Sequence, residues 1–202
     1  MAPSLTIYLS ENPKWKVLFL GYSRHQTKLI DALIAEQCEV HQTADLFEDT
    51  DYDLIISFGY RHIIKKELLT RFICPAINLH ISFLPYNKGA HPNFWSFYEG
   101  TPSGVSIHLI DEGVDTGAIL FQKLVKFDRE KTFRETHDRL KSEIETLFMQ
   151  NIRTILTRKW TSKQQNQEGT CHYLSELPKE FGGWDTNISC EIRRLHLILE
   201  KG

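Results

Sequence analysis

Two almost continuous apolar runs, residues 16–22 and 53–59, each contain a glycine at or near their end. This pattern is typical of strands that are buried on both faces of a parallel sheet. Further apolar or alternating stretches predict strands at residues 38–43, 76–80, 104–110, 119–125 and 170–173. Apolar residues at helical spacing predict helices that include residues 29–34, 65–72, 91–98, 132–158 and 189–199.

The order of these elements predicts the fold class. Strands alternate with helices, which favours an α/β architecture with a Rossmann-like, mostly parallel sheet and helices on both faces. The consecutive strands at 104–110 and 119–125 predict an antiparallel extension of that sheet. The chain turns polar at 162–170, so we interpret residues 1–160 as the main domain. Residues 161–202 are then a short C-terminal appendage of loop, hairpin and helix.

Composition narrows the expected partners and location. The formal net charge of −2 leaves no excess of basic residues for a polyanion, so nucleic acid is not expected as a partner. The first residues lack the pattern of a secretory signal, and no apolar run approaches the length of a membrane span. We therefore expect a cytoplasmic protein without a membrane partner. No metal site or disulfide framework is predicted, because the spacing of the cysteines fits neither: Cys38, Cys74, Cys171 and Cys190.

Three polar residues lie near the ends of predicted strands. Asn78 and His80 close the strand at 76–80, and Asp115 follows the strand at 104–110. Ligands of open α/β sheets bind outside the carboxyl ends of the strands, so we expect these side chains to converge. A neutral imidazole accepts a proton, a carboxylate orients it, and an amide donates to a developing oxyanion. This set predicts acyl transfer to an amine.

Each of these features alone also has an ordinary structural explanation. An Asn-x-His pair at a strand end often serves a turn. The glycine-rich segment around Asp115 is compatible with a turn, although its spacing does not fit an EF-hand. His108, on a predicted strand, is either a partner of the trio or a structural histidine. Asn78, His80 and Asp115 together, in this order and spacing, favour the catalytic interpretation.

The same residues carry a resemblance to a known family. The segments concerned are 53–60 (DLIISFGY), 77–85 (INLHISFLP), 88–90 (KGA) and 107–117 (IHLIDEGVDTG). Together they resemble the folate-dependent formyltransferases, which include methionyl-tRNA formyltransferase, glycinamide ribonucleotide formyltransferase and the N-formyltransferases of nucleotide-linked amino sugars. The strong part of the match covers roughly residues 50–127, and the sugar enzymes are the most similar branch.

The resemblance implies transfer of a formyl group from 10-formyltetrahydrofolate to a primary amine. By analogy, His80 takes the proton of the attacking amine, Asn78 donates to the oxyanion, and Asp115 orients His80 or relays the proton. The formyl donor is expected in a pocket of backbone groups and apolar side chains, at Phe58, Tyr60, Ile63, Ile64, Ile110, Asp111 and Asp115.

Two segments are candidates for binding the acceptor. One is Ser23 and Arg24, where the first strand leads into a helix, a position that favours anions. The other follows the catalytic strand and, in the resembled family, contacts the amine substrate; its candidates are Tyr86, Lys88, His91, Asn93 and Trp95. The chain lacks the large C-terminal domain and basic surplus of the tRNA branch, and the phosphate-binding Gly-Ser-Gly of the glycinamide branch. A nucleotide-linked amino sugar, used in surface glycan biosynthesis, is therefore the expected acceptor.

Two other functions remain open at this point. A 10-formyltetrahydrofolate hydrolase would use water in place of the amine. A non-catalytic binder of folate or nucleotide sugar would have no need of a poised acid–base set. The C-terminal segment is also a candidate interface for a homodimer.

Overall fold

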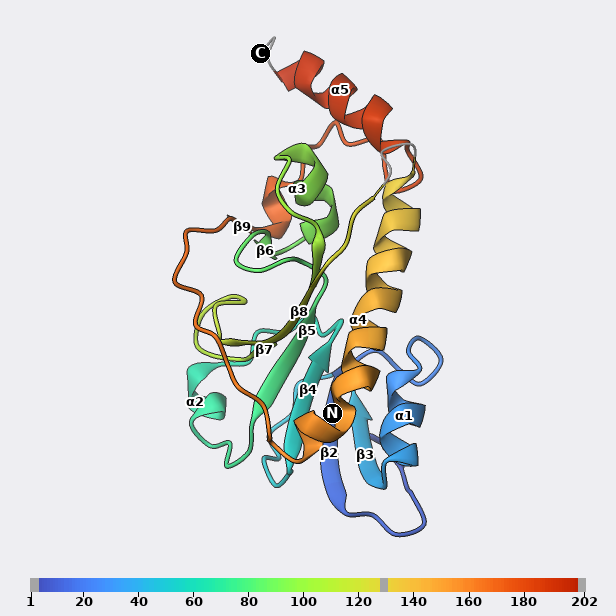
Figure 1. The fold of residues 1–202 in the computed structure, drawn as a ribbon, viewed down its shortest axis with the longest axis vertical. Helices are drawn as coiled ribbons and strands as arrows, with labels where there is room; N and C mark the ends of the chain where they lie inside the picture. Colours follow the sequence, from blue (N-terminus) through green and yellow to red (C-terminus); the bar gives the residue numbers. More distant parts are fainter. Residues whose placement is uncertain (1–3, 128–130, 200–202) are drawn as a thin grey trace.

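The computed structural model describes residues 4–127 and 131–199. Its strands are β1 (Thr6–Tyr8), β2 (Trp15–Gly21), β3 (Cys38–Thr43), β4 (Leu54–Phe58), β5 (Ala76–His80), β6 (Lys88–Gly89), β7 (Gly104–Leu109), β8 (Ile119–Leu124) and β9 (Cys171–His172). Its helices are α1 (Leu29–Ala35), α2 (Lys66–Leu69), α3 (Pro92–Tyr98), α4 (Phe133–Leu156) and α5 (Ile188–Leu199), with a 3₁₀ turn at Leu174–Glu176. Figure 1 shows these elements in their spatial arrangement.

One mixed sheet organises the molecule, with strand order β1-β3-β2-β4-β5-β7-β8. The four central strands β3, β2, β4 and β5 are parallel. Strand β1 at one edge and strands β7 and β8 at the other are antiparallel to their neighbours. The predicted α/β fold, with its parallel centre and antiparallel extension, is confirmed.

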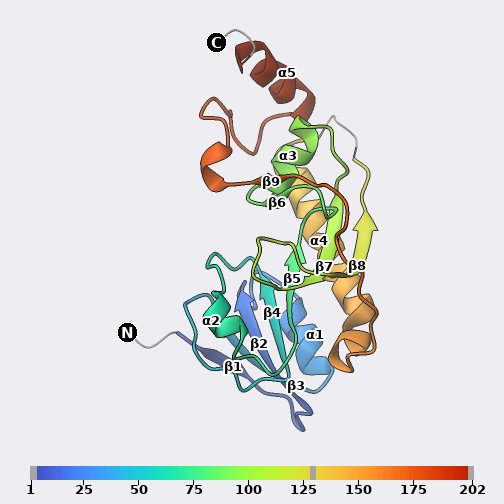
Figure 2. The same cartoon turned by 90° about the vertical axis from the view of Figure 1, so that its left-hand side faces the viewer.

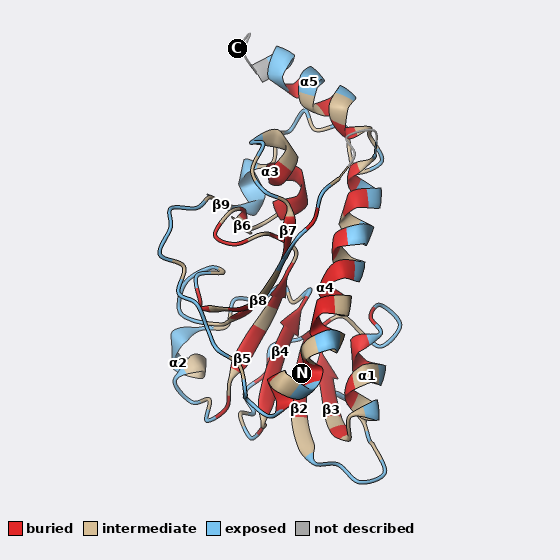
Figure 3. Ribbon diagram, viewed as in Figure 1, coloured by how far each residue is buried: buried red, intermediate tan, exposed pale blue. Residues whose placement is uncertain are grey.

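Both faces of the sheet are covered, as the apolar runs predict. Along β2, Val17 and Phe19 pack into a core with α1 and α4, whereas Leu18 and Leu20 pack into a second core on the opposite face. This alternation follows from the two-residue period of a strand. Figure 3 shows the central strands buried along most of their length. Because both faces of these central strands are buried, consecutive positions along them must be apolar.

Helix α4 is the longest described element, and it runs from the region below α5 down to the sheet, beside α1 (Figure 1). It begins with a capping box, in which the Thr132 hydroxyl accepts from the Glu135 N–H and the Glu135 carboxylate accepts from the Thr132 N–H. One of its faces packs on the sheet through Leu140, Ile144 and Phe148. The start of α4 thus packs with α3 and α5, and its later part packs on the central sheet.

After α4 the chain reverses direction and runs up the molecule to β9 and then on to α5 (Figures 1 and 2). Strand β9 pairs in parallel with β6, a short pairing that the sequence pattern does not predict. Helices α3 and α5 and the start of α4 share a small aromatic core that includes Phe94, Phe133 and Leu195. Among the described residues, no helix has the length and apolar character needed to cross a membrane.

Candidate active site

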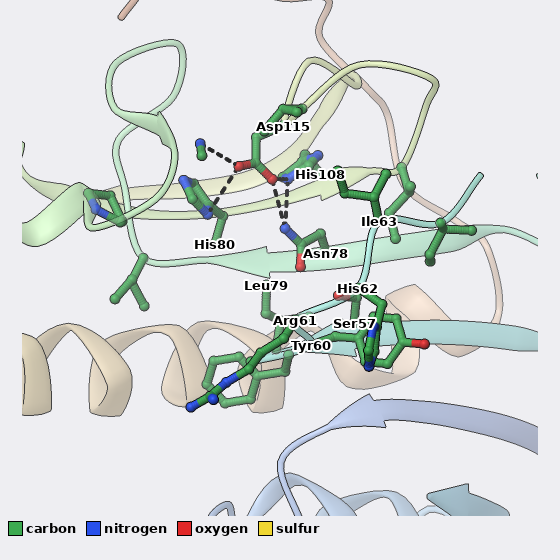
Figure 4. A pocket seen from close by; sticks show the side chains of 18 of the residues that line it. Ser57, Tyr60, Arg61, His62, Ile63, Asn78, Leu79, His80, His108 and Asp115 are labelled. Atoms are coloured by element: carbon green, nitrogen blue, oxygen red, sulfur yellow. Dashed lines mark hydrogen bonds and ion pairs between the residues drawn. The ribbon is translucent and has the colours of Figure 1, made fainter. Parts of the chain in front are cut away.

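Asn78, His80 and Asp115 lie together at the carboxyl-terminal half of β5, next to β7 (Figure 4). Because β7 is antiparallel to β5, its carboxyl end lies beside the start of β5, away from His80. The loop of residues 110–118 then folds back over β5 and returns Asp115 to the site. The side chains therefore converge through this loop, and not through two parallel strand ends as the sequence suggests.

The carboxylate of Asp115 is the centre of the site. Its Oδ1 accepts from Asn78 Nδ2 at 2.9 Å, and its Oδ2 accepts from the Gly89 N–H at 2.9 Å. His80 Nδ1 lies 3.6 Å from Oδ2, and His108 Nε2 lies 3.3 Å from Oδ1. Burial raises the pKa of Asp115, but the charge of His80 and the hydrogen bond and charge of His108, which act when these rings are protonated, together with the Gly89 hydrogen bond outweigh it and hold the pKa below its usual range. Asp115 is therefore a carboxylate throughout the neutral pH range.

The surroundings of His80 determine which ring nitrogen carries the proton. Its Nε2 lies 3.1 Å from the carbonyl oxygen of Asn87, which can only accept a hydrogen bond. In the neutral ring the proton is therefore on Nε2 and the lone pair is on Nδ1, on the side of Asp115. The residue is buried, with 8% of its surface exposed. Neutral His80 is thus arranged to accept a proton on Nδ1 beside a carboxylate.

His108 fixes the orientation of Asn78. Its Nδ1 lies 2.7 Å from the carbonyl oxygen of Leu109 and must donate there, so the neutral Nε2 accepts from Asn78 Nδ2 at 3.4 Å. The Asn78 amide nitrogen therefore faces Asp115 and His108, and Figure 4 shows its oxygen directed away from them. To donate to an oxyanion, as the sequence suggests, Asn78 must release one of these two contacts. The sequence leaves the role of His108 open; its place directly opposite Asn78 becomes visible only with the β5–β7 register.

A cavity of about 370 Å³ opens beside these side chains. Its wall contains Asn78, His80 and His108 and every residue predicted to bind the formyl donor: Phe58, Tyr60, Ile63, Ile64, Ile110, Asp111 and Asp115. It also contains residues that the sequence pattern does not indicate: Tyr22, Arg61, His137 and Lys141. The two segments predicted to bind the formyl donor, 58–64 and 110–115, therefore line the same cavity as Asn78, His80 and Asp115.

Gly59 explains why the second apolar run ends in a glycine. Its φ of +70° is in the left-handed region, and an added Cβ would lie 2.6 Å from the ring of Tyr22. The turn after β4 thus brings the backbone against Tyr22, whose ring packs edge-on against Phe58 with centroids 4.8 Å apart. All three residues line the cavity.

A second cavity, of about 290 Å³, adjoins the first and shares Ile81, Pro92 and His137 with it. Of the predicted acceptor residues it contains His91 and Asn93, and it adds Phe133, Arg134 and Trp184. Asn93 Nδ2 donates to the Phe133 carbonyl at 2.8 Å, whereas its buried Oδ1 has no hydrogen-bond partner among the residues that the structure describes. Burial lowers the pKa of His91, which keeps this ring neutral, and the ring lies 5.2 Å from that of Trp184.

The other predicted acceptor residues do not line either cavity. Ser23 and Arg24 make local contacts with Gln26 and Asp31, respectively. The remaining three lie elsewhere in the 86–95 segment: Tyr86 borders a separate cavity, Lys88 pairs with β9, and Trp95 is buried and stacked on His172 with ring centroids 3.9 Å apart. The turn at His91, which has a φ of +53°, directs only part of this segment toward the site.

Comparison with known proteins identifies the family. A family model described as formyl transferase matches residues 16–152, which is more than half of the chain. The chain belongs to this family. The family predicted from the sequence motifs is therefore confirmed, and the match includes Asn78, His80, His108 and Asp115. Trp184 and the whole segment after α4 lie outside it.

Curated members of the formyl transferase family are longer than this chain. The methionyl-tRNA formyltransferase of Finegoldia magna is 29% identical over 164 residues, covering 81% of this chain and 53% of that protein. The enzyme of the same name from Clostridium perfringens is 34% identical over 151 residues, covering 74% and 48%. The chain thus spans about half the length of these relatives.

Solved structures of formyl transferases match a larger share. The formyltransferase PseJ from Anoxybacillus kamchatkensis, solved with UDP-4,6-dideoxy-4-formamido-L-AltNAc and tetrahydrofolate, is 42% identical with a TM-score of 0.79. The alignment covers 86% of this chain and 96% of PseJ. A sugar N-formyltransferase from a Shewanella species shares the fold, with 20% identity, a TM-score of 0.73 and coverage of 88% of this chain and 85% of that protein.

Within the described residues, no cluster of His, Cys, Asp and Glu side chains is arranged to hold a metal ion.

Proposed function

We propose that this protein transfers a formyl group from 10-formyltetrahydrofolate to the primary amine of a nucleotide-linked amino sugar. The observation that carries the proposal is the cluster of Asn78, His80 and Asp115 on the wall of the larger cavity. The similarity to PseJ along 96% of that protein supports a sugar acceptor over a tRNA. A role in surface glycan synthesis and a cytoplasmic location are parts of the same proposal.

The three side chains supply the acid–base chemistry that formyl transfer needs. The donor supplies an electrophilic formyl carbon: the new bond joins this carbon to the acceptor nitrogen, and the bond that breaks joins it to N10 of the folate. Nδ1 of neutral His80 accepts the proton that the amine loses, and Asp115 stabilises the resulting imidazolium. That proton goes to N10 as the folate leaves. Asn78, turned from Asp115 or His108, donates to the formyl oxygen while it carries negative charge.

The larger cavity suits the formyl donor in size and lining. Its volume is in the range of small-molecule sites, which bury most of a ligand against apolar side chains with a few polar groups. Phe58, Tyr60, Ile63 and Ile64 supply the apolar part, and the backbone of the 110–115 loop supplies hydrogen-bonding groups. A pterin ring system placed there would lie next to the trio.

The adjoining cavity suits the nucleotide part of the acceptor. Trp184 and His91 offer two neighbouring rings for stacking, and the unpartnered Asn93 Oδ1 can accept an N–H of a base. Along α4, Arg134, His137 and Lys141 line the two cavities in succession, which is a suitable array for a diphosphate. The sugar would then extend past the shared wall toward His80.

Replacement of Trp184 by alanine is expected to weaken acceptor binding. Stacking of a base on an aromatic ring contributes about 1–3 kcal/mol, so KM for the nucleotide sugar should rise by about 5- to 150-fold. The value of kcat and KM for the folate should stay within about twofold, because the trio and the larger cavity are untouched. Steady-state kinetics would measure this, with Tyr173→Ala, an exposed aromatic outside both cavities, as the control. An unchanged acceptor KM in a folded variant would place the nucleotide elsewhere.

The activity itself is tested by following tetrahydrofolate release from 10-formyltetrahydrofolate. The panel contains no acceptor, free amines, and UDP- and dTDP-linked amino sugars, and mass spectrometry identifies the formylated product. Release that depends on a nucleotide-linked amino sugar supports the proposal. Release with water alone would identify a hydrolase, and binding without release would identify a non-catalytic protein.

A further inference from the structure

We infer that the segment of residues 160–170, between α4 and β9, positions the His80–Asp115 pair for the proposed reaction. This segment, called the strap below, lies outside the residues that match the family model. In Figure 1 it runs from the end of α4 to β9. It makes hydrogen bonds to the 110–118 loop, which contains Asp115, and to Asn87, whose carbonyl oxygen faces His80. The inference rests on the proposed function of that pair.

The first contact holds the backbone of Asp115. This residue has a φ of +52°, in the left-handed region, which is unfavourable for residues other than glycine. Gln165 Nε2 donates to the carbonyl oxygens of Asp115 at 2.9 Å and Gly117 at 2.7 Å. One amide nitrogen thus ties both sides of the turn at Thr116. The strap is anchored nearby, because Ile119 and Lys163 exchange two backbone hydrogen bonds, each of 2.8 Å.

The second contact holds the backbone of Asn87, whose carbonyl oxygen faces His80 Nε2. Asn87 is fully buried and has a left-handed φ of +55°. Its N–H donates to the Thr170 hydroxyl at 2.8 Å, and that hydroxyl lies 3.1 Å from Asn87 Oδ1. The Lys88 N–H donates to the Thr170 carbonyl at 2.9 Å. The next residues of both segments form the β6–β9 pair. The N–H of Gly89, in β6, donates to Asp115 Oδ2.

The two contacts fix the groups that face the two ring nitrogens of His80: the Asn87 carbonyl at Nε2 and the Asp115 carboxylate at Nδ1. Through Thr170, the strap fixes the carbonyl that keeps the proton on His80 Nε2. Through Gln165, it fixes the turn that presents the carboxylate to His80 Nδ1. Loss of either contact should let a left-handed residue relax toward a commoner conformation and move its group away from His80. Gln165 and Thr170 are thus positioning residues that act through Asp115 and Asn87.

The test uses variants that remove hydrogen bonds while conserving volume. Gln165→Met and Thr170→Val should each lower kcat by about 10- to 100-fold, the effect of a misplacement of about 1 Å, with both KM values within about twofold. Gln167→Met, an exposed glutamine with the same change, and Thr170→Ser, which keeps the hydroxyl, should retain the kcat of the unmodified protein. Equal kcat in the Gln165→Met and Gln167→Met variants would overturn the inference for Gln165.

Two further readouts separate positioning from a general loss of structure. In an Asp115→Asn background, Gln165→Met should have no additional effect on kcat, because the carboxylate it positions is already gone. A repeated 10- to 100-fold loss there would indicate that Gln165 acts only on the fold. Nitrogen NMR of the His80 ring should show one tautomer, protonated on Nε2, in the unmodified protein and a mixture in Thr170→Val; an unchanged spectrum overturns the inference for Thr170. Absence of formyl transfer by the unmodified protein would instead contradict the proposed function, and the NMR readout would still test the strap.

Discussion

Replacement of His80 by glutamine is expected to lower kcat by about 100- to 10,000-fold, the usual contribution of a general acid–base group. The reason is geometric: Nδ1 is the only proton acceptor of the neutral ring, and it lies beside the carboxylate of Asp115. Glutamine can still donate to the Asn87 carbonyl but has no basic nitrogen. Single-turnover release of tetrahydrofolate would measure the loss. His25→Gln, an exposed histidine outside the larger cavity, is the matched control and should keep kcat within about twofold.

The pH dependence of the unmodified enzyme should follow from the same arrangement. Proton acceptance requires the neutral ring, so kcat/KM should fall on acidification, when protonation removes the acceptor nitrogen. Asp115 does not account for this limb, because its pKa is held below the usual carboxyl range. A kcat/KM profile that is flat from about pH 5 to 8 would contradict the role of His80.

Replacement of Asn78 by alanine is expected to lower kcat by about 100- to 1000-fold, the cost of removing one oxyanion donor. The substitution also removes the hydrogen bond to Asp115 Oδ1, so part of the loss reflects a less constrained carboxylate. Both KM values should change little, because Asn78 is proposed to bind the formyl oxygen more strongly when it is charged. Steady-state kinetics with both substrates would measure this.

Asn78→Asp separates the two roles of this side chain. It keeps the size of the side chain but replaces a donor with a second carboxylate next to Asp115, about 3 Å away in the unmodified protein. Its activity should be no higher than that of the alanine variant, because it adds repulsion to the loss of the donor. If Asn78→Ala keeps kcat within about threefold, oxyanion donation by Asn78 is excluded.

The parts of the fold that depend on local pattern could be predicted from the sequence. Strands β3 and β5 begin and end where the alternation and the apolar run predict. Helix α4 ends two residues earlier than predicted, and α2 covers only Lys66–Leu69 of the predicted 65–72. No side chain caps α2, and it buries no residue, so little stabilises a longer helix there. Strand β1 was not predicted because it is only three residues long at the sheet edge.

The residues predicted to bind the formyl donor belong to two short motifs, and all of them line the larger cavity. The second cavity depends on contacts between distant segments, and of the predicted acceptor residues only His91 and Asn93 line it. Trp184 reaches the second cavity only through the packing of the C-terminal segment on α3 and α4. Ser23, Arg24 and Trp95 have chemically suitable side chains, but local hydrogen bonds, an ion pair and a stacked histidine already engage them. Gln165 lies in a polar loop with no periodic signal.

A double-mutant cycle between His80 and Asp115 would show whether the two side chains act together in formyl transfer. Single-turnover rates of tetrahydrofolate release would be compared for His80→Gln, Asp115→Asn and the double variant. If the two side chains act as one unit on one carbon, the double variant should be about as slow as the slower single variant. Losses that multiply would show that His80 and Asp115 act independently, which is incompatible with a carboxylate that stabilises the His80 imidazolium.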